Sequence, residues 1–155
     1  MADLTFRTDI AWTGMGGDGQ GSVGIGGSSL TVSAPASMGG KGVGTSPEEL
    51  LLAAVASCYS STLFAVLARH GLPVRSVETR VEGIVTGYPL NGKFAVLRVN
   101  PTIMGGDPSR SAEYEAKARH ARDRCFIGKT IAGNVDYQVG NVQALPDVAP
   151  TGPQA

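Results

Sequence analysis

The sequence predicts an α+β fold with antiparallel sheets packed on a long central helix. Short segments of alternating apolar and polar residues stand on both sides of an apolar helical run. An Asn-Gly pair separates two of these segments, which is typical of a β-hairpin and therefore of antiparallel strands. A second helical run leads into a last strand, so strands and helices do not alternate as they would in a parallel α/β sheet.

The bulk composition indicates one globular domain. The chain has 155 residues, of which 42% are hydrophobic and 17% are charged, enough to bury a core. We expect residues 1–144 to form this domain and the proline-rich residues 145–155 to be a loose, flexible tail. Basic and acidic residues balance at 13 each, which argues against a nucleic-acid or membrane partner. The first residues lack a signal-peptide pattern, so we expect a reducing, cytoplasmic location.

The first third of the chain predicts three strands separated by glycine-rich loops. Residues 4–12 alternate between apolar and polar side chains and predict a half-buried strand. Residues 14–21 predict a loop. They contain the pattern G-x-G-x-x-G, but a strand follows rather than a helix, so they do not predict a dinucleotide site. Short strands are expected at residues 22–25 and 28–33, before a second loop at residues 34–43.

The long helix has clear start and stop signals. Ser46 is a favoured N-cap, Pro47 suits the first helical position, and Glu49 completes a capping box with Ser46. The helix is expected to run to about His70, where Gly71 supplies a left-handed cap. It is apolar enough to raise the question of a membrane span. Its internal hydroxyl residues, and the lack of a second such segment, instead favour burial in a core or between subunits.

The next segment predicts a β-hairpin. Strands are expected at residues 77–85 and 93–104, on either side of Asn91-Gly92. Pro101 lies within the second of these strands. Because proline cannot donate a hydrogen bond to a neighbouring strand, it indicates an edge strand or a bulge.

A second helix and a final strand complete the predicted order. The helix opens at Asp107-Pro108, and the strand lies around residues 135–139. Four residues at helical spacing predict which side of this helix faces the core: Tyr114, Ala118, Ala121 and Cys125.

Two cysteines are the candidate reactive groups. Cys58 lies in the apolar run of the long helix, and Cys125 ends the second helix on its core-facing side. Each taken alone fits an inert buried cysteine, but a pair in a reducing compartment indicates redox chemistry. The histidines, His70 and His120, lack the spacing of a metal site, and no motif ties either to a cysteine. The sequence therefore predicts neither a metal nor a Cys–His hydrolase.

Glu48 is the third candidate site residue. It lies in the first turn of the helix that carries Cys58, where an acidic side chain is also favoured simply by the helix dipole. Ten residues separate the two, about 15 Å along a helix axis, so Glu48 does not easily reach Cys58 of its own helix. If the two act together, two such helices must lie antiparallel, which predicts a homodimer with shared sites.

Two motifs resemble the OsmC/Ohr family, the osmotically inducible and organic hydroperoxide resistance proteins. The first is residues 44–50 followed by Ala56-Ser57-Cys58, and the second is Cys125 with residues 128–135. The resemblance covers the chain from about Trp12 to Val142. It implies an OsmC/Ohr-like α+β fold and an intertwined homodimer with active sites at the subunit interface.

The resemblance also implies a thiol peroxidase that acts in oxidative stress defence. Cys58 would be the peroxidatic cysteine, reduce an organic hydroperoxide to an alcohol and become a sulfenic acid. Cys125 would close a disulfide with it, and a dithiol reductant, such as the lipoylated proteins that family members use, would reopen that disulfide. Glu48 would orient the activating cation and the peroxide. The chemistry needs no metal, haem or flavin cofactor.

The chain departs from the family pattern at two points. The family carries an arginine that pairs with the glutamate, and this chain has Asp18 or Met38 at the corresponding positions; Lys41 or Arg7 are the candidate replacements. The family's second cysteine is usually followed by proline, where this chain has Phe126. The alternative function is therefore an OsmC-like protein with weak or no peroxidase activity. Such a protein would bind an apolar ligand or sense redox state.

Overall fold

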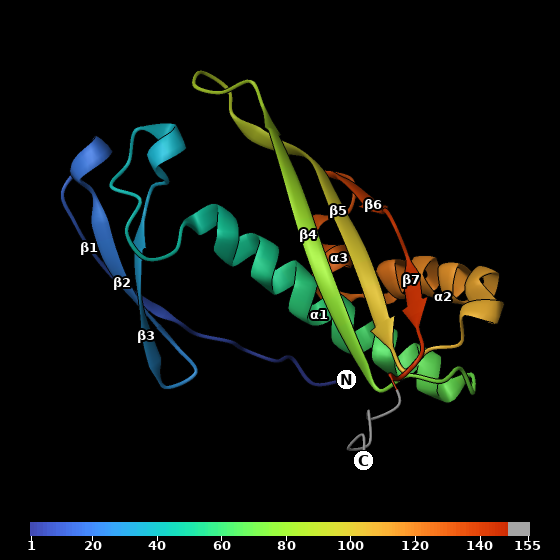
Figure 1. Ribbon diagram of the computed structural model, residues 1–155. Coiled ribbons are helices and arrows are strands. Elements are labelled where there is room, and N and C mark those ends of the chain that lie inside the picture. Colours follow the sequence, from blue (N-terminus) through green and yellow to red (C-terminus); the bar gives the residue numbers. More distant parts are fainter. Residues whose placement is uncertain (149–155) are drawn as a thin grey trace, which may run out of the picture. The chain divides into compact units, whose positions relative to one another are not determined.

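The computed structural model describes residues 1–148 and divides the chain into two compact units. The first unit is Met1–Leu51 and the second begins at Leu52. Each unit has its own sheet (Figure 1). Of the predicted tail, residues 149–155 lie outside the described part. Before them, Asp147 forms an exposed ion pair with Arg75 at 2.6 Å.

The first unit is built on a three-stranded antiparallel sheet in the order β1-β2-β3. Its strands are β1 (Asp9–Thr13), β2 (Gln20–Ile25) and β3 (Ser28–Ser33), with short 3-10 turns η1 (Gly16–Asp18) and η2 (Ala36–Met38) beside them. The prediction of a half-buried strand from residue 4 is wrong. The first strand begins at Asp9, because β2 ends at Ile25 and leaves no partner for the residues before Asp9. The strand is exposed throughout.

Two glycines at the end of the first loop and the start of β2 make room for the tryptophan ring; the predicted loop ends at Gly19, because β2 begins at Gln20. A Cβ atom added at Gly19 would lie 2.6 Å from the Trp12 side chain, and one added at Gly21 would lie 2.7 Å from it. Such distances are far below van der Waals contact, so a larger residue at either position would displace the ring. Within the G-x-G-x-x-G pattern, Gly19 therefore serves packing against Trp12, whereas Gly14 and Gly16 adopt positive φ angles of 79° and 54°.

Helix α1 (Pro47–Arg69) starts and ends as predicted. The Glu49 amide donates to Ser46 Oγ at 3.2 Å, and the Ser46 amide donates to Glu49 Oε2 at 2.9 Å. This is the reciprocal capping box. At the other end, Gly71 has a φ of +65°, the left-handed conformation that terminates helices.

The second unit holds a four-stranded mixed sheet. Its strands are β4 (Ser76–Thr86), β5 (Lys93–Met104), β6 (Asp136–Val139) and β7 (Gln143–Leu145). β4 and β5 form the predicted antiparallel hairpin, whereas β6 and β7 both pair with β5 in parallel. The expectation of antiparallel pairing is wrong for β6 and β7. Two helices connect β5 to β6, and such a crossover brings the chain back in the same direction.

Pro101 lies in a central strand rather than at the predicted edge. On one side of β5 it stands opposite Thr79 of β4. On the other side, pairing with β6 ends at Val99 and pairing with β7 starts at Thr102. Pro101 therefore occupies the gap between two partner strands, where a missing amide donor breaks no ladder.

Three helices cover one face of this sheet (Figure 1). They are α1, α2 (Ser111–Arg124), which follows the turn η3 (Pro108–Arg110), and the short α3 (Phe126–Ile131). The predicted core-facing residues of the second helix are all fully buried: Tyr114, Ala118, Ala121 and Cys125. They pack with buried residues of the other elements: Val55, Tyr59, Leu63, Leu67, Leu97, Val99 and Ile103.

The apolar surface of α1 is only partly covered within the chain. Among the described residues, this is the one helix long and apolar enough to cross a membrane by length and composition, and 28% of its most apolar window is buried. One side is exposed and made of small or apolar residues: Ala53, Ala54, Ser57, Ser61, Phe64 and Ala68. A helix that is apolar all round is normally covered on all sides.

Candidate active site

Cys58 lies in the middle of α1, on the border between its buried and exposed sides. Its side chain is half-buried and packs against the core of the second unit. Two hydroxyl groups further along the helix, Ser61 and Thr62, donate to its carbonyl oxygen at 3.0 and 2.7 Å. These bonds occupy the Cys58 carbonyl from the turn of α1 that follows it.

Cys125 lies at the junction between α2 and α3. Its amide donates to Ala121 at 2.8 Å and so ends α2, and its carbonyl accepts from Lys129 at 2.9 Å in the first turn of α3. Its side chain is fully buried, and its sulfur accepts the Gly128 amide at 3.4 Å. The sulfur therefore acts as the N-cap of α3.

The first turn of α3 brings the two cysteines together. The Ile127 amide donates to Cys58 Sγ at 3.5 Å, next to the amide that holds Cys125 Sγ. Both thiols are free and they interact with each other. Two sulfurs that are 67 residues apart in the chain are thus held by consecutive peptide groups.

The two thiols have opposite acidities. Burial alone raises the pKa of Cys58, but hydrogen bonds from the Ile127 amide, the Cys125 thiol and the Phe126 amide outweigh it, so the pKa lies below that of an ordinary thiol. Burial also raises the pKa of Cys125, and there the Gly128 amide does not compensate, since a charged Cys58 opposes a second charge. The site therefore pairs one thiol poised to ionise with one held neutral.

Such a pair has the chemical character of a nucleophile, Cys58, beside a second thiol that keeps its proton, Cys125. The thiolate is the reactive form of cysteine, and a partly exposed thiol with a lowered pKa is the form found in redox proteins. In the described part of the chain, no group of three or more His, Cys, Asp or Glu side chains is placed to hold a metal ion.

Glu48 lies in the first unit, in the first turn of α1. Its side chain is half-buried, and its Oε2 atom is buried without a hydrogen-bond partner among residues 1–148. Buried carboxylate oxygens normally have partners. In the described chain no ion pair joins Glu48 to Lys41 or Arg7, the two cations that the sequence offered as replacements for the family arginine.

Tyr137 is a member of this site that the sequence analysis missed. It was expected only as a strand residue, but its hydroxyl is buried beside the two cysteines, and charge on Cys125 raises its pKa further beyond the effect of burial. The signal available in the sequence was a bulky phenol on a strand that follows the Cys125 motif.

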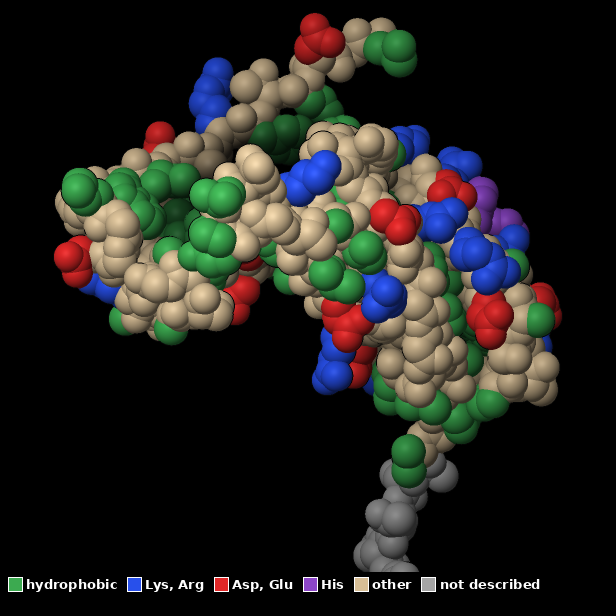
Figure 2. Space-filling view, turned by 90° about the horizontal axis from the view of Figure 1, so that it is seen from above, with side chains coloured by type: hydrophobic (Ala, Val, Ile, Leu, Met, Phe, Trp, Pro, Cys, Tyr) green, Lys and Arg blue, Asp and Glu red, His purple; other side chains and the backbone are tan. Residues whose placement is uncertain are grey.

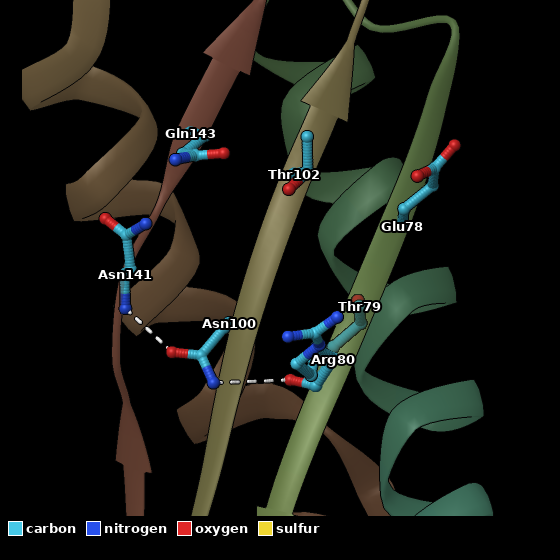
Figure 3. A pocket seen from close by; sticks show the side chains of 7 residues that line it. All are labelled: Glu78, Thr79, Arg80, Asn100, Thr102, Asn141 and Gln143. Atoms are coloured by element: carbon cyan, nitrogen blue, oxygen red, sulfur yellow. Dashed lines mark hydrogen bonds between the residues drawn. The ribbon is translucent and has the colours of Figure 1, made fainter.

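Two other surface features do not form a comparable site. A hollow of about 570 Å³ on the outer face of β4, β5 and β7 is lined by polar side chains without a cysteine (Figure 3). There Asn100 accepts from the Asn141 amide at 2.9 Å, so its side chain is already engaged. His70 and His120 lie edge to face with ring centres 6.5 Å apart, among basic side chains (Figure 2). This positive surrounding disfavours a bound cation.

Comparison with known proteins gives a consistent result. The family model for OsmC-like protein matches residues 39–140. An uncharacterized protein of Bacillus subtilis (strain 168), YmaD, is 33% identical over 144 residues, covering 90% of this chain and 94% of that protein. The chain belongs to the OsmC-like protein family.

Solved structures agree with this assignment. An organic hydroperoxide resistance protein OsmC from Legionella pneumophila has a TM-score of 0.71 and 26% identity, over 91% of this chain and 99% of that one. An organic hydroperoxide resistance protein from Elizabethkingia anophelis has a TM-score of 0.69 at 19% identity, over 93% and 100%, and supports the fold. The fold is therefore the predicted α+β OsmC/Ohr-like fold, and the family supports a redox role in stress.

Proposed function

We propose that the protein is a thiol peroxidase that reduces organic hydroperoxides to alcohols, with Cys58 as the peroxidatic cysteine. The observation that carries the proposal is the pairing of the two sulfurs at the start of α3, one with a lowered and one with a raised pKa. This pairing supplies a thiolate for attack and a neutral thiol for the following step.

The reaction divides into two oxidative steps. The Cys58 thiolate attacks the terminal oxygen of the hydroperoxide; the O–O bond breaks, the alkoxide leaves and takes up a proton, and Cys58 becomes a sulfenic acid. The Cys125 sulfur then attacks the Cys58 sulfur. An S–S bond forms, the S–O bond breaks, and the hydroxyl leaves as water with the Cys125 proton. A dithiol, small or protein-bound as in a lipoylated protein, returns two electrons and restores both thiols.

Backbone amides take part of the role that the family gives to arginine. The amides of Phe126 and Ile127 both favour the ionised form of Cys58. A proline at position 126 would lack one of these donors. The departure from the family pattern at this position therefore adds a hydrogen bond to the thiolate in a chain without the arginine.

The proposal includes a homodimer in the cytoplasm. The exposed side of α1 carries only small or apolar side chains from Ala53 to Ala68 and no charge, which fits burial against the same helix of a second copy. The unpartnered oxygen of Glu48 is the second support, since a shared site would supply the missing partner from the other subunit or from the bound peroxide. In this arrangement Glu48 orients the peroxide for attack.

The test is turnover by cysteine variants in an assay coupled to a dithiol. Wild-type protein is expected to consume cumene hydroperoxide, and Cys58→Ser is expected to abolish this. Cys125→Ser is expected to retain one turnover, leaving a sulfenic acid that dimedone traps at Cys58. The proposal would be falsified if Cys58→Ser consumed the hydroperoxide as fast as wild type.

A second candidate function is favoured by one observation. In the described chain no cation pairs with Glu48, and the family's activating arginine is absent. A family member of this kind would bind an apolar ligand or sense redox state without efficient turnover. Tight binding of a fatty acid, together with slow hydroperoxide consumption and a slowly oxidised Cys58, would select this function over the peroxidase.

A further inference from the structure

One buried tyrosine differs from the others in this core. The Tyr59 hydroxyl donates to the Ala118 carbonyl at 3.1 Å, and the Tyr114 hydroxyl donates to Pro73 at 2.6 Å. The Tyr137 hydroxyl is also buried, yet no group among residues 1–148 meets it with good hydrogen-bond geometry, and the Cys125 thiol is the side chain it interacts with. Leaving a buried hydroxyl unpaired is costly, so such a group calls for a specific explanation.

The position of Tyr137 provides that explanation. Its ring lies against Gly128 so closely that a Cβ atom there would be 2.6 Å from the ring. The Gly128 amide is the group that donates to Cys125 Sγ at 3.4 Å. The phenol therefore packs against the peptide that holds the second sulfur. Burial, then negative charge on Cys125, raise the pKa of Tyr137, so the phenol keeps its proton and remains a hydrogen-bond donor.

We propose that Tyr137 is a positioning residue for the second cysteine, whose hydroxyl donates a hydrogen bond to the Cys125 sulfur when negative charge develops there. A neutral thiol is a weak acceptor, whereas a thiolate is a strong one. The hydroxyl already interacts with the Cys125 thiol in the resting protein without a well-formed hydrogen bond, and the bond becomes strong when charge develops on that sulfur. The proposal rests on the redox pairing of the two cysteines in the proposed function.

The charge on Cys125 arises most clearly when the disulfide is reduced. Cys58 is half-exposed and Cys125 is fully buried, so a dithiol's thiolate attacks the Cys58 sulfur. The S–S bond breaks and its electron pair leaves on Cys125 as a thiolate. The second thiol of the reductant gives its proton to Cys125 and closes the reductant's own disulfide, which releases Cys58. Tyr137 stabilises the leaving thiolate and so selects Cys125 as the leaving sulfur.

The experiment compares Tyr137→Phe with wild type after both are oxidised with diamide. Reduction by dithiothreitol is followed over a range of pH by acid quenching and thiol counting. Removal of the hydroxyl is expected to slow reduction by about 10- to 100-fold, the usual worth of a hydrogen bond to a charged group. The fold-deficit should be about equal at every pH tested, because the same dithiothreitol thiolate attacks both proteins and the phenol keeps its proton throughout. Thermal stability of the reduced protein is expected to stay unchanged or rise, because the variant removes an unpaired buried group.

Tyr59→Phe is the matched control. It removes a buried hydroxyl that already has a partner, so it is expected to lower the melting temperature and to leave the reduction rate unchanged. Equal reduction rates for Tyr137→Phe and wild type would overturn the proposal. So would a slower rate accompanied by the stability loss of the control, or a wild-type protein in which diamide forms no disulfide.

This test does not depend on the peroxide reaction. If wild type forms the disulfide with diamide but leaves cumene hydroperoxide intact, the peroxidase proposal fails. The two reduction rates then still decide the role of Tyr137. If the disulfide of Tyr137→Phe is then reduced more slowly than that of wild type, Tyr137 is assigned to a disulfide that senses redox state.

Discussion

The amide of Ile127 donates to the sulfur of Cys58 at 3.5 Å, although the two residues are 69 positions apart in the sequence. The bond joins the middle of α1 to the first turn of α3 and makes the ionisation of Cys58 depend on how that turn is built.

Phe126→Pro is expected to weaken the nucleophile without disturbing the fold. The Cys125 backbone, with φ −59° and ψ 124°, is in the conformation that precedes proline, and proline is favoured in the first helical position. The substitution removes the Phe126 amide donor, so the pKa of Cys58 should rise and its alkylation near pH 7 should slow by about 10-fold. Iodoacetamide kinetics measure this.

The control for that variant is Phe126→Ala. The Phe126 side chain is 67% exposed, so alanine removes little packing and keeps the amide. If Phe126→Pro and Phe126→Ala slow the alkylation of Cys58 equally, the Phe126 side chain and not its amide sets the reactivity of the thiol.

The stability of the reduced protein is expected to depend on pH through Cys58. Its folded-state pKa lies below the ordinary thiol value, so the unfolded chain holds the proton over a range where the folded chain has lost it. The resulting stabilisation is full above the unfolded pKa, about 8.5, and is lost as pH falls through the folded value. Denaturant titrations of wild type and Cys58→Ser should show a difference that grows with pH across this window. A difference that is flat or shrinks would contradict the lowered pKa.

Ser46→Ala is expected to destabilise the protein by about 1 kcal/mol, because it removes the side chain that caps α1. Urea unfolding followed by circular dichroism measures the loss. Ser109→Ala is a suitable comparison, since its hydroxyl bonds an exposed Asp107 and does not cap a long helix. Equal losses for both would show that the capping box contributes nothing specific.

Phe64→Glu is expected to convert the proposed dimer to monomer. Phe64 is 41% exposed on the apolar side of α1, and a charge there would have to be buried in the dimer. Sedimentation velocity measures the mass, and the coupled assay should lose turnover if Glu48 acts across the interface. Ala116→Glu, on the exposed side of α2, should change neither. A wild-type monomer with full activity would contradict the shared site.

The sequence predicted the parts of the fold that short-range chemistry controls. The start of α1 follows from Pro47 at the first helical position and from Ser46 and Glu49, which bond to each other within one turn. The core side of α2 follows from helical spacing. The parallel pairing of β6 and the six-residue helix α3 were not predicted, because pairing direction is settled by tertiary contacts and α3 is too short to show a periodicity.

The candidate site was predicted in its residues more than in its geometry. Cys58 and Cys125 were identified from their motifs, and the structure brings them together through Ile127 and Gly128. Tyr137 was not predicted because its relation to Cys125 exists only after β6 has packed against α3.

The position of Trp12 gives the molecule a built-in pair of optical probes. The chain has one tryptophan, which packs over two glycines in the first unit, and four tyrosines, all of which lie after Leu52. Tryptophan fluorescence therefore follows the first unit, while the near-ultraviolet tyrosine signal follows the second. Coincident melting curves from the two signals would mean that the units unfold as one cooperative whole, and separate curves would give each unit a stability of its own.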